Sequence, residues 1–157
     1  VELWVSEDVA LARALGATGV HLAERSPPPA TFAATGLALG VSLHRPVSRG
    51  VADLALCRHA FLAPLFRTPS KPESAPLRPD GFLALAAGLP PALRCFALGG
   101  ITVERLPELA RHGIRHVAAI RLFFDAGDPA RVAAVVRERL APAAGGAASS
   151  GTAEERR

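Results

Sequence analysis

Short apolar runs alternate with helix-like stretches along most of the chain, and this rhythm restricts the possible folds more than any other feature. Six of the runs are predicted to be strands: residues 3–5, 19–22, 37–42, 60–63, 94–98 and 117–120. Strands that alternate with helices form a parallel sheet with right-handed crossovers. The sequence therefore predicts an α/β fold with about six βα units. Both a (β/α) barrel and an open, doubly wound sheet fit this pattern.

The helical segments and one long loop complete the pattern. Helices are expected at residues 8–15, in a short segment ending near Gly36, at 49–56, at 82–87, from Pro107 onward and at 129–140. Residues 64–79 contain five prolines and are predicted to form a loop, and so long a loop in a compact domain is usually functional or disordered. We expect one domain over residues 1–140 and a disordered, Ala/Gly/Ser-rich tail over residues 141–157.

Composition excludes several classes of protein. Half of the residues are apolar and a fifth are charged, which excludes a disordered chain, and no apolar run approaches the ~20 residues of a membrane span. The first residues lack a secretory signal, and the two cysteines lack metal or disulfide spacing, so we expect a cytoplasmic location. Aromatic residues make up only 5% of the chain, which disfavours nucleic-acid binding by base stacking. The net charge of +4 favours small anionic partners.

Two stretches have residues suited to phosphate binding. Gly99 and Gly100 follow a predicted strand and precede a helix, where exposed backbone N–H groups can face an anion. Thr68, Ser70 and Lys71, the only lysine, place two hydroxyls and an ammonium within four residues of the long loop. The alternatives are a plain turn at the glycines and a solvated proline-rich loop.

Ser42 and His44 end the third predicted strand with the same side-chain parity, so both are expected at one face near a barrel mouth. His44 is a candidate acid–base residue, and the alternative is a strand-end histidine that bonds the backbone. The remaining histidines are predicted to take no part in a site: His21 as a core residue, and His59, His112 and His116 because they lack convergent partners.

Acidic residues follow the first two predicted strands. Glu7 and Asp8 come after the first strand, and Glu24 comes after the second. Carboxylates at neighbouring strand ends can hold Mg²⁺ for a phosphorylated substrate. The alternative is acidic charge that complements a helix N-terminus, and it is stronger for Asp8.

Taken in order, five of these segments resemble the thiamine-phosphate synthase family, which includes the related thiazole tautomerases. The matching segments are residues 15–22, 39–44, 66–72, 97–102 and 113–120, and the resemblance covers about residues 3–140. Its most specific parts are Thr-Pro-Ser-Lys at 68–71 and Gly-Gly-Ile-Thr at 99–102. The resemblance implies a (β/α)₈ barrel. It also implies Mg²⁺-dependent condensation of hydroxymethylpyrimidine diphosphate with hydroxyethylthiazole phosphate, which yields thiamine phosphate and pyrophosphate.

The resemblance also implies roles for individual residues. His44 and Lys71 are the expected catalytic residues, and Glu7 is the expected magnesium ligand. The expected substrate-binding residues are Ser42, Thr68 and Ser70 with Lys71 on the diphosphate side, and Gly99, Gly100 and Arg121 on the thiazole phosphate side. Arg121 stands where the family has serine, so it either strengthens anion binding or blocks the site.

Departures from the family leave three functions open. By the match, residue 1 falls at the family's third strand, so two strands are missing, and Ser26 replaces a second magnesium-binding aspartate. The chain is then a divergent synthase, a metal-independent thiazole tautomerase that uses His44, or a non-catalytic domain that is truncated, decayed or part of a longer fusion. An open barrel would need a homodimer mate, a partner chain or its own missing N-terminal segment to cover its edge.

Overall fold

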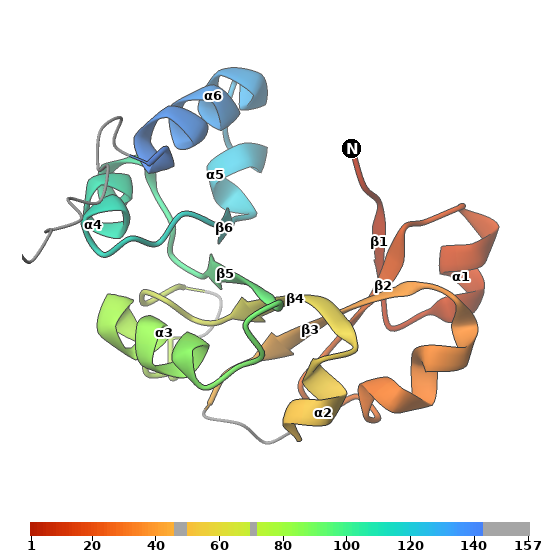
Figure 1. The fold of residues 1–157 in the computed structure, drawn as a ribbon. Helices are drawn as coiled ribbons and strands as arrows, with labels where there is room; N and C mark the ends of the chain where they lie inside the picture. The colour runs from red at the N-terminus through yellow and green to blue at the C-terminus, as the bar shows by residue number, and fades with distance from the viewer. Residues whose placement is uncertain (46–49, 70–71, 143–157) are drawn as a thin grey trace, which may run out of the picture.

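Among the residues that the structure describes, one sheet of six parallel strands organises the protein, and its strands follow one another in chain order (Figure 1). The computed structural model describes residues 1–45, 50–69 and 72–142. The strands are β1 (Trp4–Ser6), β2 (Gly19–Leu22), β3 (Ala38–Leu43), β4 (Cys57–Leu62), β5 (Arg94–Leu98) and β6 (Val117–Ala118). The helices are α1 (Val9–Ala14), η1 (Pro29–Thr35), α2 (Val51–Leu54), α3 (Arg78–Ala87), η2 (Val103–Arg105), α4 (Leu106–Arg111), α5 (Arg121–Phe124) and α6 (Pro129–Leu140).

The strand order decides between the two predicted architectures. A doubly wound sheet reverses its strand order at a switch point, whereas strands that are added in sequence curl toward a barrel. Here every strand pairs in parallel with its predecessor, and the order never reverses. The fold is therefore an incomplete (β/α) barrel, with six strands in the described part of the chain. Within the described residues, β1 and β6 each have a neighbouring strand on one side only.

The two faces of the sheet carry different side chains because successive strand residues point to opposite faces. The face toward the helices is apolar, and its fully buried residues include Val20, Leu22, Val41, Leu43 and Leu62. These side chains belong to two core clusters, a small one under β1, β2 and α1 and a large one under the rest of the sheet. The opposite, concave face carries Trp4, His21, Ser42, His59, Phe61 and Phe96. Polar and aromatic side chains thus gather where a closed barrel has its interior.

Strand β4 begins at Cys57, three residues before the predicted start at residue 60. Helix α2 ends at Leu54, two residues before the end of the helix predicted over residues 49–56. Arg58 and His59 look too polar for a buried strand, but they lie in a strand whose concave side accepts polar groups. The predicted start of this strand was therefore wrong. Because β4 starts earlier, His59 lies within the sheet.

Two further boundaries differ from the sequence prediction. Helix α3 begins at Arg78 rather than at residue 82. Pro79, predicted as the last residue of the long loop, instead lies in the first turn of this helix, where proline is well tolerated. Strand β6 stops at Ala118, and an unpredicted short helix, α5, begins at Arg121. Arg121 therefore lies at the start of a helix and not at the end of a strand.

The predicted helix starts at both ends of the chain are confirmed. The carboxylate of Asp8 accepts a hydrogen bond from the backbone N–H of Leu11 at 2.8 Å, and Asp128 accepts one from Arg131 N–H at 3.0 Å. The predicted tail falls almost entirely on residues 143–157, which lie outside the described residues. In the described part of the chain, no helix has the length and apolar character needed to cross a membrane.

Candidate functional site

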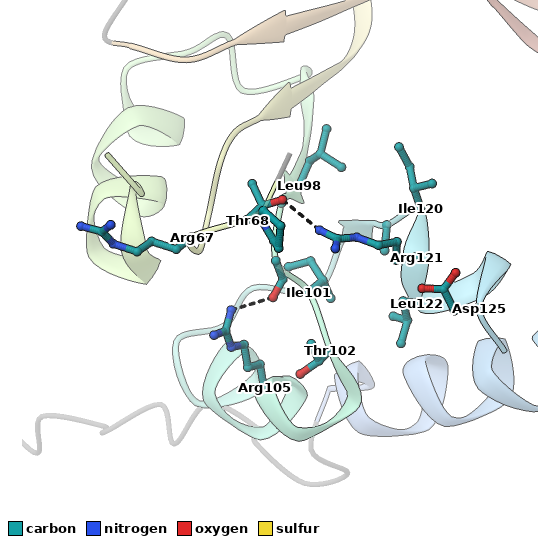
Figure 2. Close-up of a pocket in the computed structure, with 14 residues that line it drawn as sticks. Arg67, Thr68, Leu98, Ile101, Thr102, Arg105, Ile120, Arg121, Leu122 and Asp125 are labelled. Carbon is teal, nitrogen blue, oxygen red and sulfur yellow. Dashed lines mark hydrogen bonds between the residues drawn. The ribbon is translucent and has the colours of Figure 1, made fainter. Parts of the chain in front are cut away.

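A cavity of about 460 Å³ lies where the carboxyl ends of β4, β5 and β6 meet (Figure 2). The loop after β4 contributes Arg67 and Thr68, the turn after β5 contributes Gly99 and Gly100, and α5 contributes Arg121. In barrels the loops after the strands hold the ligand, and the last strands commonly hold phosphate. The structure thus brings together four of the residues predicted to bind substrate: Thr68, Gly99, Gly100 and Arg121.

The turn after β5 requires glycine at both positions. Gly99 and Gly100 have φ angles of 102° and 64°, which side chains rarely adopt. A Cβ at Gly100 would lie 2.8 Å from the carbonyl oxygen of Arg67, and one at Gly99 would lie 2.9 Å from Cβ of Pro64. The loop after β4 therefore passes directly against the bare backbone of the turn.

Backbone hydrogen bonds fix that close approach. Leu65 N–H donates to the carbonyl of Leu98 at 2.7 Å, and Phe66 N–H donates to the carbonyl of Gly99 at 3.1 Å. The beginning of the long loop thus continues the pairing of β4 with β5. It places Thr68 at the cavity.

Three arginines line this cavity, Arg67, Arg105 and Arg121, and the last two contact other lining residues. Arg121 donates from Nη2 to the hydroxyl of Thr68 at 3.1 Å, and Arg105 donates from Nη1 to the carbonyl of Gly100 at 2.7 Å (Figure 2). The guanidinium of Arg105 also lies 4.3 Å from the centre of the Phe66 ring, a cation–π contact. Sequence reasoning missed Arg105, although it lies only five residues after Gly100 and a basic side chain so close to the glycine pair could have indicated it.

The structure describes only part of the predicted anion-binding loop. Ser70 and Lys71 lie outside the described residues. Their predicted roles on the diphosphate side therefore remain predictions. Of the motif at residues 68–71, the structure describes Thr68 and Pro69, and the half-buried Thr68 supplies the hydroxyl.

His44 and Glu24 meet at the carboxyl ends of β3 and β2. Nδ1 of His44 lies 3.1 Å from Oε2 of Glu24, and the backbone N–H of His44 donates to Oε1 at 3.4 Å. A carboxylate at Nδ1 favours the tautomer with its hydrogen on that nitrogen, so that Nε2 becomes the acceptor. This pair can act as an oriented general base, in the way that a carboxylate orients histidine in other enzymes.

Glu7 and Ser26 form a separate pair at the ends of β1 and β2, where the hydroxyl of Ser26 donates to the carboxylate of Glu7. Glu24, the neighbouring carboxylate, already contacts His44. In residues 1–45, 50–69 and 72–142, no three histidine, cysteine or acidic side chains come together as metal ligands. In this arrangement these side chains do not form a ready site for Mg²⁺.

The structure corrects the prediction for two histidines. His21 is half-buried on the concave face rather than in the core, and its Nε2 lies 2.9 Å from the hydroxyl of Ser42. His59, predicted to lack partners, is 9% exposed, and its Nε2 lies 3.1 Å from Nδ1 of His21. Burial lowers the pKa of His21 to about 4, with a smaller contribution from His59. Burial also lowers the pKa of His59, so both rings are neutral at pH 7.

Fold and cavity together define the class: a parallel (β/α) barrel, here incomplete, with a basic, glycine-lined cavity at the carboxyl ends of its strands. Residues 1–123 match the family model described as thiamine monophosphate synthase. The chain is 34% identical to the thiamine-phosphate synthase of Deinococcus radiodurans over 89% of its length, and 31% identical to that of Thermus thermophilus over 89%. The chain belongs to this family, as its motifs indicated.

Solved structures agree on the fold. A thiamine phosphate pyrophosphorylase from Pyrococcus furiosus superposes with a TM-score of 0.70 at 18% identity, over 89% of this chain and 67% of that one. The 3-hexulose-6-phosphate synthase from Salmonella typhimurium superposes with a TM-score of 0.56 at 17% identity, over 84% and 65%. Coverage is unequal among the relatives. The chain spans 50% of the Deinococcus protein and 68% of the Thermus protein.

Proposed function

We propose that this chain carries out, or forms part of a protein that carries out, the synthesis of thiamine phosphate. The substrates would be hydroxymethylpyrimidine diphosphate and hydroxyethylthiazole phosphate, both small phosphorylated molecules. The carrying observation is the cavity in which the Gly99–Gly100 turn, Thr68 and Arg121 converge, since all are donors suited to phosphate oxygens. Membership of the family supports the assignment.

The proposed reaction needs charge stabilisation more than acid–base chemistry. The bond between the pyrimidine methylene carbon and the diphosphate oxygen breaks, and its electron pair leaves with pyrophosphate. The thiazole nitrogen then gives its lone pair to that carbon, which yields thiamine phosphate. Donors at the diphosphate stabilise the developing negative charge. Thr68, Ser70, Lys71 and Ser42 would serve this side.

The thiazole phosphate would sit at the turn after β5. The N–H groups of the half-buried Gly99 and Gly100 offer donors there, and Arg121 offers a guanidinium that can bind two oxygens at once. Arg121 already reaches Thr68 from the opposite wall of the cavity (Figure 2). We therefore propose that Arg121 strengthens anion binding rather than blocking the site.

Binding can be tested before turnover. We expect inorganic pyrophosphate with Mg²⁺, at ~100 times its Kd, to add about 2.7 kcal/mol of stability and to raise the melting temperature by roughly 5–10 °C. Arg121→Ala and Lys71→Ala should reduce the shift, whereas Arg137→Ala, an exposed arginine on α6, should not. The same melt without Mg²⁺ tests whether the ion is needed. A wild-type chain with no shift and no product from both substrates would contradict the proposal.

A second candidate is thiazole tautomerase activity, and the Glu24–His44 pair favours it. His44 has an oriented ring, and proton transfer within the thiazole needs one such base and no metal. His44→Ala should abolish tautomerisation, and Glu24→Gln should lower it by about 10²-fold or less. If tautomerisation is absent in the wild type or unchanged in His44→Ala, this candidate fails.

The remaining parts of the proposal concern location and partners. A cytoplasmic location is proposed on the ground that Cys57 and Cys95 form no disulfide with each other. A domain extending over residues 1–140 is also proposed, since packed elements continue to Leu140 of α6. We also propose that a second copy of the chain or further βα units cover the edge of the sheet, and the sedimentation behaviour of the chain tests the first of these.

A further inference from the structure

Three side chains and one glycine form a continuous polar row across the concave face of the sheet. His21 on β2 is in register with Gly40 on β3, and Gly40 is in register with His59 on β4. The two imidazoles meet above Gly40, and Ser42 lies two residues further along β3, with its hydroxyl at the other nitrogen of His21. The row thus connects His59, through His21, to a residue proposed to hold diphosphate.

Gly40 is what allows the two rings to meet. A Cβ at this position would lie 2.9 Å from Nδ1 of His21 and closer still to Nε2 of His59. The rings are nearly parallel, with an angle of 16° between their planes and 5.2 Å between their centres. The space above β3 is therefore filled by imidazole instead of by a side chain of that strand.

Neighbouring rings hold the pair in place. Trp4 packs edge-on against His59 with a centre-to-centre distance of 4.4 Å, and Phe61 stacks on His21 at 4.5 Å. Phe96 closes the far side of His59 at 6.0 Å. Rings packed in this way have little freedom to rotate, so the nitrogens stay where the hydrogen bonds need them.

Which residue donates in each hydrogen bond of the row follows from the burial of His59 at one end of it. A neutral imidazole has one N–H donor and one bare nitrogen. If Ser42 donated to His21 and His21 donated to His59, the hydrogen of His59 would sit on Nδ1, which has no hydrogen-bond partner among the described residues. An orphaned N–H in a residue that is 9% exposed is costly, and a bare acceptor nitrogen costs less.

We propose that His59 is a positioning residue that acts through His21 to turn the Ser42 hydroxyl toward an anionic ligand. His59 donates from Nε2 to Nδ1 of His21, and His21 donates from Nε2 to the oxygen of Ser42. The hydroxyl hydrogen of Ser42, on a half-buried side chain, then points away from the row and donates to a diphosphate oxygen. The ligand part of this inference rests on the proposed function.

The free protein gives the first test, since it does not depend on any activity. Nitrogen-15 NMR of the imidazoles at pH 7.5 identifies which nitrogen of His21 carries the hydrogen. We expect Nε2 in the wild type and in His59→Gln, whose amide can replace the donor. In His59→Phe, which keeps a ring but has no donor, the Nδ1–H form should appear. A wild type with its hydrogen on Nδ1, or a tautomer population unchanged in His59→Phe, would overturn the relay.

Binding of inorganic pyrophosphate by calorimetry gives the second test. His59→Phe should weaken binding about three- to tenfold, as expected for one hydrogen bond, and His59→Gln should restore it to within about twofold. In the Ser42→Ala background His59→Phe should have no further effect. Equal losses in both backgrounds, or no rescue by Gln, would overturn the positioning role. If the wild type does not bind pyrophosphate, the proposed function fails, and the His21 tautomer still decides whether the relay exists.

Discussion

Gly100 and Gly16 show that two glycines with similar backbone angles can be required for different reasons. Gly16 ends α1 with φ at 59°, and a Cβ there would meet nothing within 4 Å. Gly100 has φ at 64°, and a Cβ there would collide with the carbonyl of Arg67. Only the structure separates the two, because the collision comes from a loop that is distant in sequence.

Alanine at these two positions should therefore have unequal effects. We expect Gly16→Ala to lower the free energy of unfolding by about 1–2 kcal/mol, the cost of a side chain in the left-handed region. Gly100→Ala should cost more than this, because the loop after β4 must also move, and it should weaken pyrophosphate binding. Urea denaturation measures both variants, with Gly16→Ala as the matched control. If both variants lose the same free energy of unfolding, the loop after β4 moves away from residue 100 at no cost, and the expectation is wrong.

A pH dependence follows from the buried imidazole of His21. Its pKa is about 4 in the folded protein against an ordinary value of 6.5, so between these values the unfolded chain binds a proton that the folded chain does not. The contribution to stability is complete above about pH 6.5 and is lost as the pH falls toward 4. Urea titrations at pH 7 and pH 5 should show a smaller loss in His21→Gln than in the wild type. Arg137→Gln, at an exposed position on α6, serves as the control and should lose as much as the wild type.

Helix α6 illustrates how an element can depend on one local contact. Asp128 caps its first turn at 3.0 Å, Pro129 opens the helix, and Val136 and Leu140 pack into the large core. These features could all be predicted from the sequence, because a cap and an apolar stripe depend on neighbouring residues. Strand β4 could not, because its polar residues are tolerated only by the concave face that five other strands create.

Loss of the Asp128 cap should destabilise the protein by a definite amount. Asp128→Ala should lower the free energy of unfolding by about 1 kcal/mol, since it leaves an N–H of the first turn without its acceptor. Asp128→Asn should be close to neutral, because asparagine caps about as well. Urea denaturation decides the matter, and a cost for Asn as large as that for Ala would point to charge rather than capping.

At the scale of the whole molecule, the β6 side of the sheet presents apolar side chains to solvent. Ile120 is 69% exposed and Phe124 is 85% exposed, and both lie just after β6, which has one neighbouring strand among the described residues. Apolar side chains beside a sheet edge favour association.

We expect the chain to self-associate in a concentration-dependent way, as sedimentation velocity would show. Phe124→Ser should weaken this association while it changes the free energy of unfolding by no more than about 0.5 kcal/mol. Leu83→Ser, at an exposed position on α3, should leave association unchanged. A wild type that stays monomeric at every concentration would contradict this expectation.

The sequence by itself determined the βα rhythm, the helix caps and the family, because these depend on periodicity and on short motifs. The rhythm alone fitted both a barrel and an open sheet, and the family resemblance favoured the barrel. It also located the Gly99–Gly100 turn and Thr68. Tertiary structure alone decided that Glu24 meets His44, and that His59 reaches His21 across Gly40. Each of these contacts joins residues that only strand register and loop paths bring together, and a side chain's partners across a sheet leave no periodic signal in its own segment.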